Sequence, residues 1–329
     1  MRIIPIEMSR IDEFVLLWNT EWGTEFPMRK ELFKQNSVDD ENVFLKASFM
    51  AVNENEEVVG IIICKRWQEE LAIEMNRYAA WIQVLSWIQV LLVSSEYQGK
   101  GIGTSLLTHA EQAVLEDGAT EILLGRDPWH YFPGIPVQAQ KSIQWFERKG
   151  YQNISTDYDL IKIYQENEFI EKPRFHNVEA ELLTLAEKEE FLQFLKRVFP
   201  GRWEYEAIHY FDKGGTGREF VVLKKEGRII GFSRLNDQHS PMIAQNVYWA
   251  PLFREPLGGI GPLGIDQGER GNGYGLAVVQ AACYFLRERK INRIVIDWTG
   301  LVNFYAKLGY EIWKEYKSYR KPLVDHPTP

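Results

Sequence analysis

The sequence predicts an α+β protein built from two tandem copies of one unit, each a mixed β-sheet flanked by helices. Its 329 residues exceed the usual size of a single domain. One order of predicted elements occurs twice along the chain, as expected for a duplicated unit. Glycines at alternate positions also occur twice, as QGKGIG at 98–103 and RGNGYG at 270–275. We therefore expect two domains, 1–168 and 169–329, joined near the polar stretch 164–175.

The composition is that of a globular protein and narrows the class of partner. Hydrophobic residues make up 45% of the chain, charged residues make up 26%, and the formal net charge is −8. This charge disfavours binding to nucleic acid or to an anionic membrane surface, because their phosphate groups are repelled. The two cysteines, Cys64 and Cys283, are far apart in the sequence and suggest neither a disulfide framework nor a metal site.

The sequence shows no pattern of a targeting or membrane segment. The N-terminal stretch lacks a signal-peptide core, because acidic residues interrupt it early. The longest apolar stretch, around 79–93, contains Gln83, Ser86 and Gln89 and is too short and polar to span a bilayer. We therefore expect a cytoplasmic protein that binds neither nucleic acid nor membrane.

In the first half, a strand and two helices precede a hairpin. The expected elements are a strand at 2–6, a helix from Ser9, a helical stretch near 28–36 and a hairpin at 49–67. The stretch 81–91 repeats its apolar pattern with a period of six, which keeps equivalent residues on one face of a strand. After the glycines we expect a helix at 104–115, a strand at 121–125, an aromatic loop and a helix ending before Gly150.

The second half repeats this order with a shorter final part. The expected elements are a strand at 175–183, a helix at 186–199, a hairpin at 218–235, a helix at 276–289, a strand at 293–297 and a short helix ending before Gly309. The segment between the last glycine of the glycine run and the closing Gly-Tyr pair is longer in the first half. The extra length matches an insertion at 128–140, PWHYFPGIPVQAQ.

Each glycine run has the features of an anion-binding turn. It lies between a strand and a helix start, where backbone N–H groups are unpaired and carry partial positive charge. Glycines leave these groups uncovered, so a phosphate can approach closely. Neither copy has the spacing of a Walker A loop, G-x-x-x-x-G-K-[ST], or of the dinucleotide fingerprint, G-x-G-x-x-G. Two copies in equivalent places favour a pyrophosphate cradle over a simple glycine-rich turn.

The two runs resemble the acyl-CoA-binding motif of the GNAT superfamily of N-acetyltransferases, Q/R-x-x-G-x-G/A. The closing segments FERKGY at 146–151 and YAKLGY at 305–310 resemble the C-terminal motif of that family, Y-x-K-x-G-F/Y. The resemblance covers essentially the whole chain as two GNAT-like units. It implies a sheet whose central strands splay apart, with the pantetheine of acetyl-CoA between them and its pyrophosphate on the glycine loop.

Acetyl-CoA is therefore the expected co-substrate, and the resemblance assigns binding residues in both copies. In the first copy they are Leu92, Val93, Gln98, Gly99, Lys100, Gly101, Ile102, Gly103 and Thr104. In the second copy they are Gly264, Ile265, Arg270, Gly271, Asn272, Gly273, Tyr274, Gly275 and Leu276. A free N–H of the strand before each glycine run is suited to stabilise the oxyanion of acyl transfer.

Attack of an amine on a thioester also requires a base and an acid for the leaving thiolate. In the family the tyrosine of the closing motif commonly supplies that proton, which points to Tyr305. The first copy has Phe146 there, so we expect the second half to be the transferase. Asp297, at a strand end, and His130, in the inserted loop, are the candidate bases. A capping aspartate and a structural histidine remain the alternatives for these two residues.

No cluster of His, Cys, Asp or Glu has metal-ligand spacing in the sequence, and the reaction needs no metal. The role of the first half stays open: it either binds acetyl-CoA without turnover, retains activity, or acts as a structural partner.

The expected acceptor is a small polar amine, with an amino sugar favoured. Aromatic residues of the second half could stack on a sugar face; they are Trp203, Tyr205, Tyr210, Tyr248 and Trp249. The tandem layout resembles mycothiol-synthase-type enzymes, whose acceptor is a glucosamine derivative. A polyamine, an aminoglycoside and a protein or peptide N-terminus remain open as acceptors. A non-catalytic acetyl-CoA sensor is the alternative from another class, and either a monomer or a homodimer is compatible with the sequence.

Overall fold

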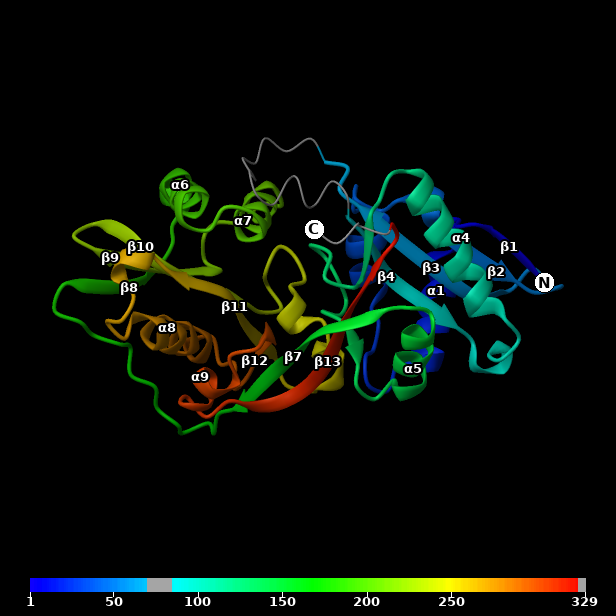
Figure 1. Ribbon diagram of the computed structural model, residues 1–329. Helices are drawn as coiled ribbons and strands as arrows, with labels where there is room; N and C mark the ends of the chain where they lie inside the picture. Colours follow the sequence, from blue (N-terminus) through cyan, green and yellow to red (C-terminus); the bar gives the residue numbers. More distant parts are fainter. Residues whose placement is uncertain (70–84, 325–329) are drawn as a thin grey trace. The chain divides into compact units, whose positions relative to one another are not determined.

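The computed structural model describes residues 1–69 and 85–324, which form two compact units. Unit 1 comprises residues 1–69, 85–157 and 316–324. Unit 2 comprises residues 158–315. Each unit contains strands of a mixed β-sheet with helices packed against them (Figure 1). The α+β class with two repeated units, expected from the sequence, is therefore confirmed.

Unit 1 has the strands, helices and hairpin that the sequence predicts. Its own strands are β1 (Arg2–Pro5), β2 (Phe49–Val52), β3 (Val58–Arg66), β4 (Leu85–Val93), β5 (Glu121–Leu124) and β6 (Ile135–Pro136). Its helices are α1 (Ile11–Trp22), α2 (Lys30–Phe33), α4 (Ile102–Glu116) and α5 (Gln140–Arg148). The strand predicted at 81–91 is confirmed from Leu85 onward, and residues 81–84 lie outside the described residues.

The sheet of unit 1 has the order β1-β2-β3-β4-β5, with β4 and β5 parallel and the other neighbours antiparallel. Apolar residues of β3 alternate between its two faces. Ile62 and Cys64 pack in one core with residues of α4 and α5. The neighbouring Ile61 and Ile63 are fully buried on the opposite face, where α1 lies against β3. Helices thus cover both faces of this sheet.

Unit 2 repeats this arrangement. Its own strands are β8 (Val178–Leu182), β9 (Phe220–Lys225), β10 (Arg228–Asn236), β11 (Leu257–Ile265) and β12 (Arg293–Thr299). Its helices are α6 (Lys188–Val198), α7 (Arg202–Asp212), α8 (Tyr274–Glu288) and α9 (Val302–Ala306). The sheet order is β12-β11-β10-β9-β8, and α6 and α7 lie on the face opposite α8 and α9 (Figure 1). Helix α7 was not expected from the sequence.

Two long strands are divided between the units. In β7 (Gln152–Ile163), residues 158–163 belong to unit 2 and pair antiparallel with β12. In β13 (Glu311–Pro322), residues 316–322 belong to unit 1, where the strand pairs antiparallel with β5. The boundary expected at 168/169 stays a prediction, and the compact units place residues 158–168 with the second half of the chain and residues 316–324 with the first. Each half of the chain ends in a 12-residue strand, and that strand pairs with a strand of the other half.

The central parallel strands part in both units. In unit 1 the ladder between β4 and β5 ends at Ile88, although β4 continues to Val93. In unit 2 the ladder between β11 and β12 ends at Ile260, although β11 continues to Ile265. Directly after these points, both strands also shift register against their antiparallel neighbours, β3 and β10. The splayed sheet implied by the family resemblance is therefore present in each unit.

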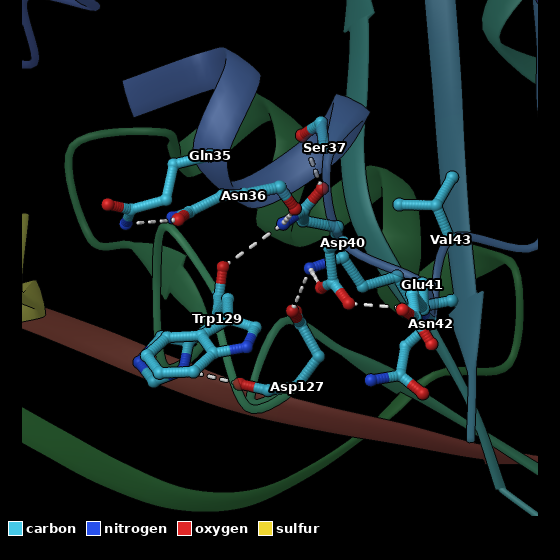
Figure 2. A network of polar contacts seen from close by, with 12 residues as sticks. Gln35, Asn36, Ser37, Asp40, Glu41, Asn42, Val43, Asp127 and Trp129 are labelled. Carbon is cyan, nitrogen blue, oxygen red and sulfur yellow. Dashed lines mark hydrogen bonds and ion pairs between the residues drawn. The ribbon is translucent and has the colours of Figure 1, made fainter. Parts of the chain in front are cut away.

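A buried ion cluster joins β3 of unit 1 to two of its loops. The Lys65 ammonium lies 2.6 Å from Asp40 Oδ2 and 2.7 Å from Asp127 Oδ2. Figure 2 shows Asp40 and Asp127 approaching each other from different segments. Burial lowers the pKa of Lys65, but the two carboxylates outweigh it and raise the pKa. The Lys65 ammonium and the two carboxyl groups thus depend on one another inside the protein.

We expect Lys65→Met to destabilise unit 1 by about 3–5 kcal/mol, because two buried carboxyl groups would lose the ammonium that they share. The free energy of unfolding from urea denaturation measures this loss. The matched control is Lys34→Met, which removes the exposed ion pair with Asp39 and should cost less than about 1 kcal/mol. Similar losses for the two variants would contradict the assignment.

Candidate functional site

Both glycine runs form open turns at the start of a helix. Gly99 and Gly101 have φ of 74° and 84°, and Gly271 and Gly273 have φ of 87° and 79°. These values lie in the left-handed region that favours glycine. Apart from adjoining residues, no described heavy atom lies within 4 Å of the position that a Cβ would take at any of the four. A ligand group can therefore approach the backbone directly.

The helices that follow begin without a side-chain cap. Gly101 precedes α4, Gly273 precedes α8, and neither helix has a side-chain hydrogen bond at its first turn. The first N–H groups of each helix, from 102–104 and 274–276, have no acceptor within the helix. These N–H groups and the helix dipole favour an anion at this position. Both copies thus have the geometry of the expected pyrophosphate cradle.

The third glycine of each run lies beside an aromatic ring of the same unit. A Cβ at Gly103 would lie 3.7 Å from the Trp145 ring, and a Cβ at Gly275 would lie 3.4 Å from the Phe304 ring. The other polar residues of the runs contact their own loop. Lys100 lies over the Tyr97 ring at 4.7 Å, and Asn272 donates a hydrogen bond to a backbone carbonyl of the same turn.

The first residue of each motif turns back onto the preceding strand. Gln98 Nε2 donates to the Val93 carbonyl at 3.0 Å, and Arg270 Nε donates to the Ile265 carbonyl at 3.1 Å. The next N–H along each strand, that of residue 94 or 266, bonds instead to the antiparallel neighbour. Because antiparallel pairing alternates, the N–H groups of Val93 and Ile265 are directed toward the side where the strands part.

Only one of the two expected oxyanion donors in each unit therefore faces the side where the strands part. Val93 and Ile265 direct their N–H groups to the parted side, whereas Leu92 and Gly264 direct theirs to β3 and β10. Gly264 has a packing role in addition, because a Cβ there would collide with the Phe199 ring.

Asp297 lies at the position of β12 where its pairing with β11 has ended. Its side chain is partly buried, and its Oδ1 accepts a hydrogen bond from Asn246 Nδ2 at 3.0 Å. Burial is the largest influence and raises the pKa of Asp297 to about 6, although Arg202 and the Asn246 hydrogen bond lower it. A carboxyl group that titrates near neutral pH is suited to accept and release a proton.

Tyr305 of α9 lies in the core of unit 2, and only 5% of it is exposed. Its ring contacts those of Phe304 and Tyr310, and Thr299 hydrogen-bonds its hydroxyl. Burial and the neighbouring Asp297 charge raise the pKa of Tyr305, so the phenol stays protonated. The structure therefore brings Tyr305 and Asp297 into electrostatic contact, with the phenol in the form that a proton donor needs.

The equivalent positions in unit 1 lack both groups. The ladders of the two units end at Leu124 and Ile296, so the next residue is Gly125 in unit 1 and Asp297 in unit 2. Phe146, the residue that replaces Tyr305 in the closing motif, is buried against the rings of neighbouring aromatic residues. Unit 1 therefore keeps the cradle without the carboxylate and the phenol.

The inserted loop of unit 1 packs into the interior. Trp129, His130 and Tyr131 are each at most 6% exposed. His130 Nδ1 lies 2.8 Å from the Asp127 carbonyl, and the Asp127 carboxylate pairs with Lys65. Figure 2 shows Trp129 beside this cluster. The sequence placed the candidate base His130 in this inserted loop, and in the structure the segment is a packed part of unit 1, because its aromatic side chains lie against other rings.

Four of the five aromatic residues expected to stack on a sugar are almost fully buried, namely Tyr205, Tyr210, Tyr248 and Trp249. The hydroxyl of Tyr210 donates to Glu219 and accepts from the Gly217 N–H, so this residue organises the loop after α7. Asn246, Arg202 and Glu206, which influence Asp297, were not singled out from the sequence.

Within residues 1–69 and 85–324, no group of three or more His, Cys, Asp or Glu side chains is arranged to hold a metal ion. Over the same residues, none of the helices has the length and apolar character that crossing a membrane requires.

Comparison with known proteins places these features in a family. The family model described as "Acetyltransferase (GNAT) family" matches residues 11–132 and 188–310. Mycothiol acetyltransferase of Acidothermus cellulolyticus is 27% identical over 123 residues, which cover 34% of this chain and 36% of that protein. The match thus spans about a third of the length of this curated relative.

Two solved structures show the same fold. The glucosamine N-acetyltransferase region of a fungal multi-domain GH3 β-N-acetylglucosaminidase has a TM-score of 0.83 at 24% identity, covering 97% of this chain and 38% of that chain. A tandem GNAT protein from the clavulanic acid biosynthesis pathway has a TM-score of 0.67 at 12% identity and covers 99% of each chain.

We expect Gly273→Val to weaken acetyl-CoA binding to unit 2 by roughly tenfold or more, because valine adopts this backbone conformation poorly and its side chain fills the open space. Isothermal titration calorimetry measures the affinity. The matched control is Gly227→Val, in the β9–β10 turn, where φ is 78° and the surroundings are equally open. Gly101→Val tests unit 1 in the same way. Loss of binding in Gly101→Val but not in Gly273→Val would indicate that acetyl-CoA binds at the glycine turn of unit 1 instead.

Proposed function

This chain belongs to the acetyltransferase (GNAT) family, and on that premise we propose that it transfers an acetyl group from acetyl-CoA to the primary amine of a small polar acceptor. The observation that carries the proposal is the composition of unit 2. An uncovered glycine cradle, a strand N–H at Ile265 directed toward the parted side, a carboxyl with a pKa of about 6 and a protonated phenol occur in one repeat. These are the groups that amine acylation by a thioester requires.

The residues of unit 2 fit acetyl-CoA because the space over Gly271 and Gly273 is open to a pyrophosphate. Acetyl-CoA supplies an acetyl group activated as a thioester. In the proposed reaction, Asp297 takes a proton from the acceptor's ammonium group, directly or through water. The freed amine attacks the thioester carbonyl carbon, and the Ile265 N–H donates to the oxygen that becomes negative.

The proposed reaction ends with cleavage of the carbon–sulfur bond. Tyr305 donates its proton to the leaving sulfur, and the nitrogen loses a second proton as the amide forms. Asp297 or water returns a proton to Tyr305. The balance is one ammonium and one acetyl-CoA giving one N-acetyl amine, one CoA thiol and one proton, so no oxidant, reductant or metal takes part in these steps.

Unit 1 is assigned a non-catalytic role in this proposal. It retains Gly99 and Gly101 in the same open conformation, so acetyl-CoA binding without turnover is compatible with it. Gly125 and Phe146 provide neither a base nor an acid at the equivalent positions. His130 is then a structural residue of unit 1.

An amino sugar is the favoured acceptor. Two similar proteins, a glucosamine N-acetyltransferase region and a mycothiol acetyltransferase, support an acceptor of this type. The net charge of −8 favours a cationic small molecule over a polyanion. Both cysteines are free and buried, which supports a cytoplasmic location, with the protein acting as a monomer or a homodimer.

We expect Tyr305→Phe to lower kcat by about 100-fold while leaving the acetyl-CoA affinity unchanged, because only the proton donor is lost. A CoA-release assay and calorimetry measure the two quantities. Tyr310→Phe is the matched control, since it removes another buried hydroxyl of the same core, bonded to Cys283. Equal kcat in Tyr305→Phe and wild type would remove Tyr305 from this role.

The ionisation of Asp297 gives a pH prediction. Because the base must be deprotonated and its pKa is raised to about 6, kcat/KM should rise with pH through about 6 and level off above it. Asp297→Asn should lower kcat/KM by about 100-fold or more and abolish this rise of kcat/KM with pH, the acidic limb of the profile. A pH–rate profile of both proteins checks the assignment, which fails if the variant keeps the wild-type profile.

The acceptor is identified by measuring CoA release with a panel of amines that includes amino sugars, polyamines, aminoglycosides and peptides. Release with amino sugars alone supports the proposal. Acetyl-CoA binding without release for any amine would instead indicate a sensor.

A further inference from the structure

Asn246 occupies the point where β11 and β12 separate. It belongs to a short 3-10 helix, η6 (Gln245–Val247), and is 3% exposed. The last ladder pair of the two strands is Ile260 with Ile296, so Gly261 and Asp297 are the first residues that the ladder leaves unpaired. Asn246 Nδ2 donates to Asp297 Oδ1 at 3.0 Å and to the Gly261 carbonyl at 3.4 Å. One side-chain amide therefore bridges the two strands where their own hydrogen bonds stop.

The chemistry of the partners determines which way this amide faces. An ionised carboxylate and a backbone carbonyl can only accept hydrogen bonds, so the Asn246 nitrogen must face both Asp297 and Gly261. Its oxygen then faces β10, where it accepts a hydrogen bond from Asn236 Nδ2 at 3.1 Å. Asn236 is fully buried, and among the residues that the structure describes its own Oδ1 has no hydrogen-bond partner. The orientation of both amides is therefore dictated from the Asp297 end.

The strand beneath the amide is shaped to admit it. A Cβ at Gly259 would collide with Asn246 Oδ1, and a Cβ at Gly261 would lie 3.4 Å from Asp297 Oδ1. Gly261 also has φ of 130°, which disfavours other residues there. Two glycines of β11 thus make room for the bridge, and the segment that carries Asn246 packs directly on this strand.

We propose that Asn246 is a positioning residue for acetyl transfer: its amide holds the Asp297 carboxylate by Oδ1 where the strands part, so that Oδ2 takes the acceptor's proton. The proposal rests on the proposed function of Asp297 as the base. Asn246 itself touches neither substrate and acts through Asp297.

The other charged groups around Asp297 define what Asn246 adds. On α7, Arg202 lowers and Glu206 raises the pKa of Asp297. On α9, Tyr305 is a neutral phenol coupled to the same carboxylate. On β7, Asp159 accepts from the N–H of Trp298, the residue after Asp297. The backbone N–H of Asp297 itself and the Asn246 amide are neutral donors to this carboxylate, so both favour the carboxylate form without adding charge.

The test replaces the donor and follows the ionisation of Asp297 in two ways. Asn246→Leu keeps the approximate volume and removes the hydrogen bond. We expect the pKa of Asp297, measured by ¹³C NMR titration of labelled aspartate carboxyls, to rise by about one unit. The acidic limb of the kcat/KM profile should move to higher pH by the same amount, while the acetyl-CoA affinity stays that of the wild type.

A second variant and a control guard against a simple loss of folding. Asn246→Asp keeps the shape of the side chain and places a second carboxylate beside Asp297. The acidic limb of the kcat/KM profile should therefore move to a higher pH than in Asn246→Leu. The control Gln89→Leu removes a buried amide of unit 1 that makes hydrogen bonds to Asn36, Ser37 and Trp129. It should change stability without moving the pKa of Asp297 or the limb.

The outcomes separate this inference from the proposed function. An unchanged NMR pKa in folded Asn246→Leu, or a rate loss that is equal at all pH values, overturns the role of Asn246. A shifted NMR pKa with an unmoved rate limb instead overturns Asp297 as the base and leaves the Asn246–Asp297 contact standing.

Discussion

The loss of pairing between the two central parallel strands is the constraint on which the site of unit 2 depends. A strand that leaves its neighbour exposes N–H and C=O groups that must find other partners. In unit 2 the Ile265 carbonyl is met by Arg270, and the Gly261 carbonyl by Asn246. The N–H of Ile265 is left for a substrate oxyanion in the proposed mechanism. Asp297 lies at the first position beyond the ladder, so the parting of the strands also determines where the proposed base lies.

The two units share the backbone conformation of the glycine turn but differ in the residues at the end of the neighbouring strand. Both have glycines with positive φ at the cradle, and both fold the first motif residue back onto the strand. At the position of Asp297, unit 1 has Gly125, whose Cβ would collide with the Phe132 carbonyl of the inserted loop. That loop returns over the strand end and is secured by Lys65 and Gln89. In unit 1 the inserted loop therefore lies against the position that corresponds to the proposed base of unit 2.

The local features of fold and site were predictable because they depend on short sequence patterns. Alternating glycines before an apolar periodic segment require an open turn and a helix, and both formed as expected. Helix α7 was missed because its aromatic residues were interpreted as ligand contacts rather than as a buried helix face. Asn246 was missed because a single asparagine in an irregular segment has no periodic signal. His130 and Asp127 lie in a loop whose burial depends on residues far away in the sequence.

By itself, the sequence determined the α+β class, the duplication, the two cradles and the Phe146/Tyr305 difference, since these follow from the identities of neighbouring residues. The tertiary structure alone decided which unit each long strand completes, because β7 and β13 pair with strands remote in the sequence. It also decided the state of Asp297, whose pKa reflects burial, α7 and an amide 51 residues away. Ionisation and strand pairing depend on which groups meet in space, and that requires the folded chain.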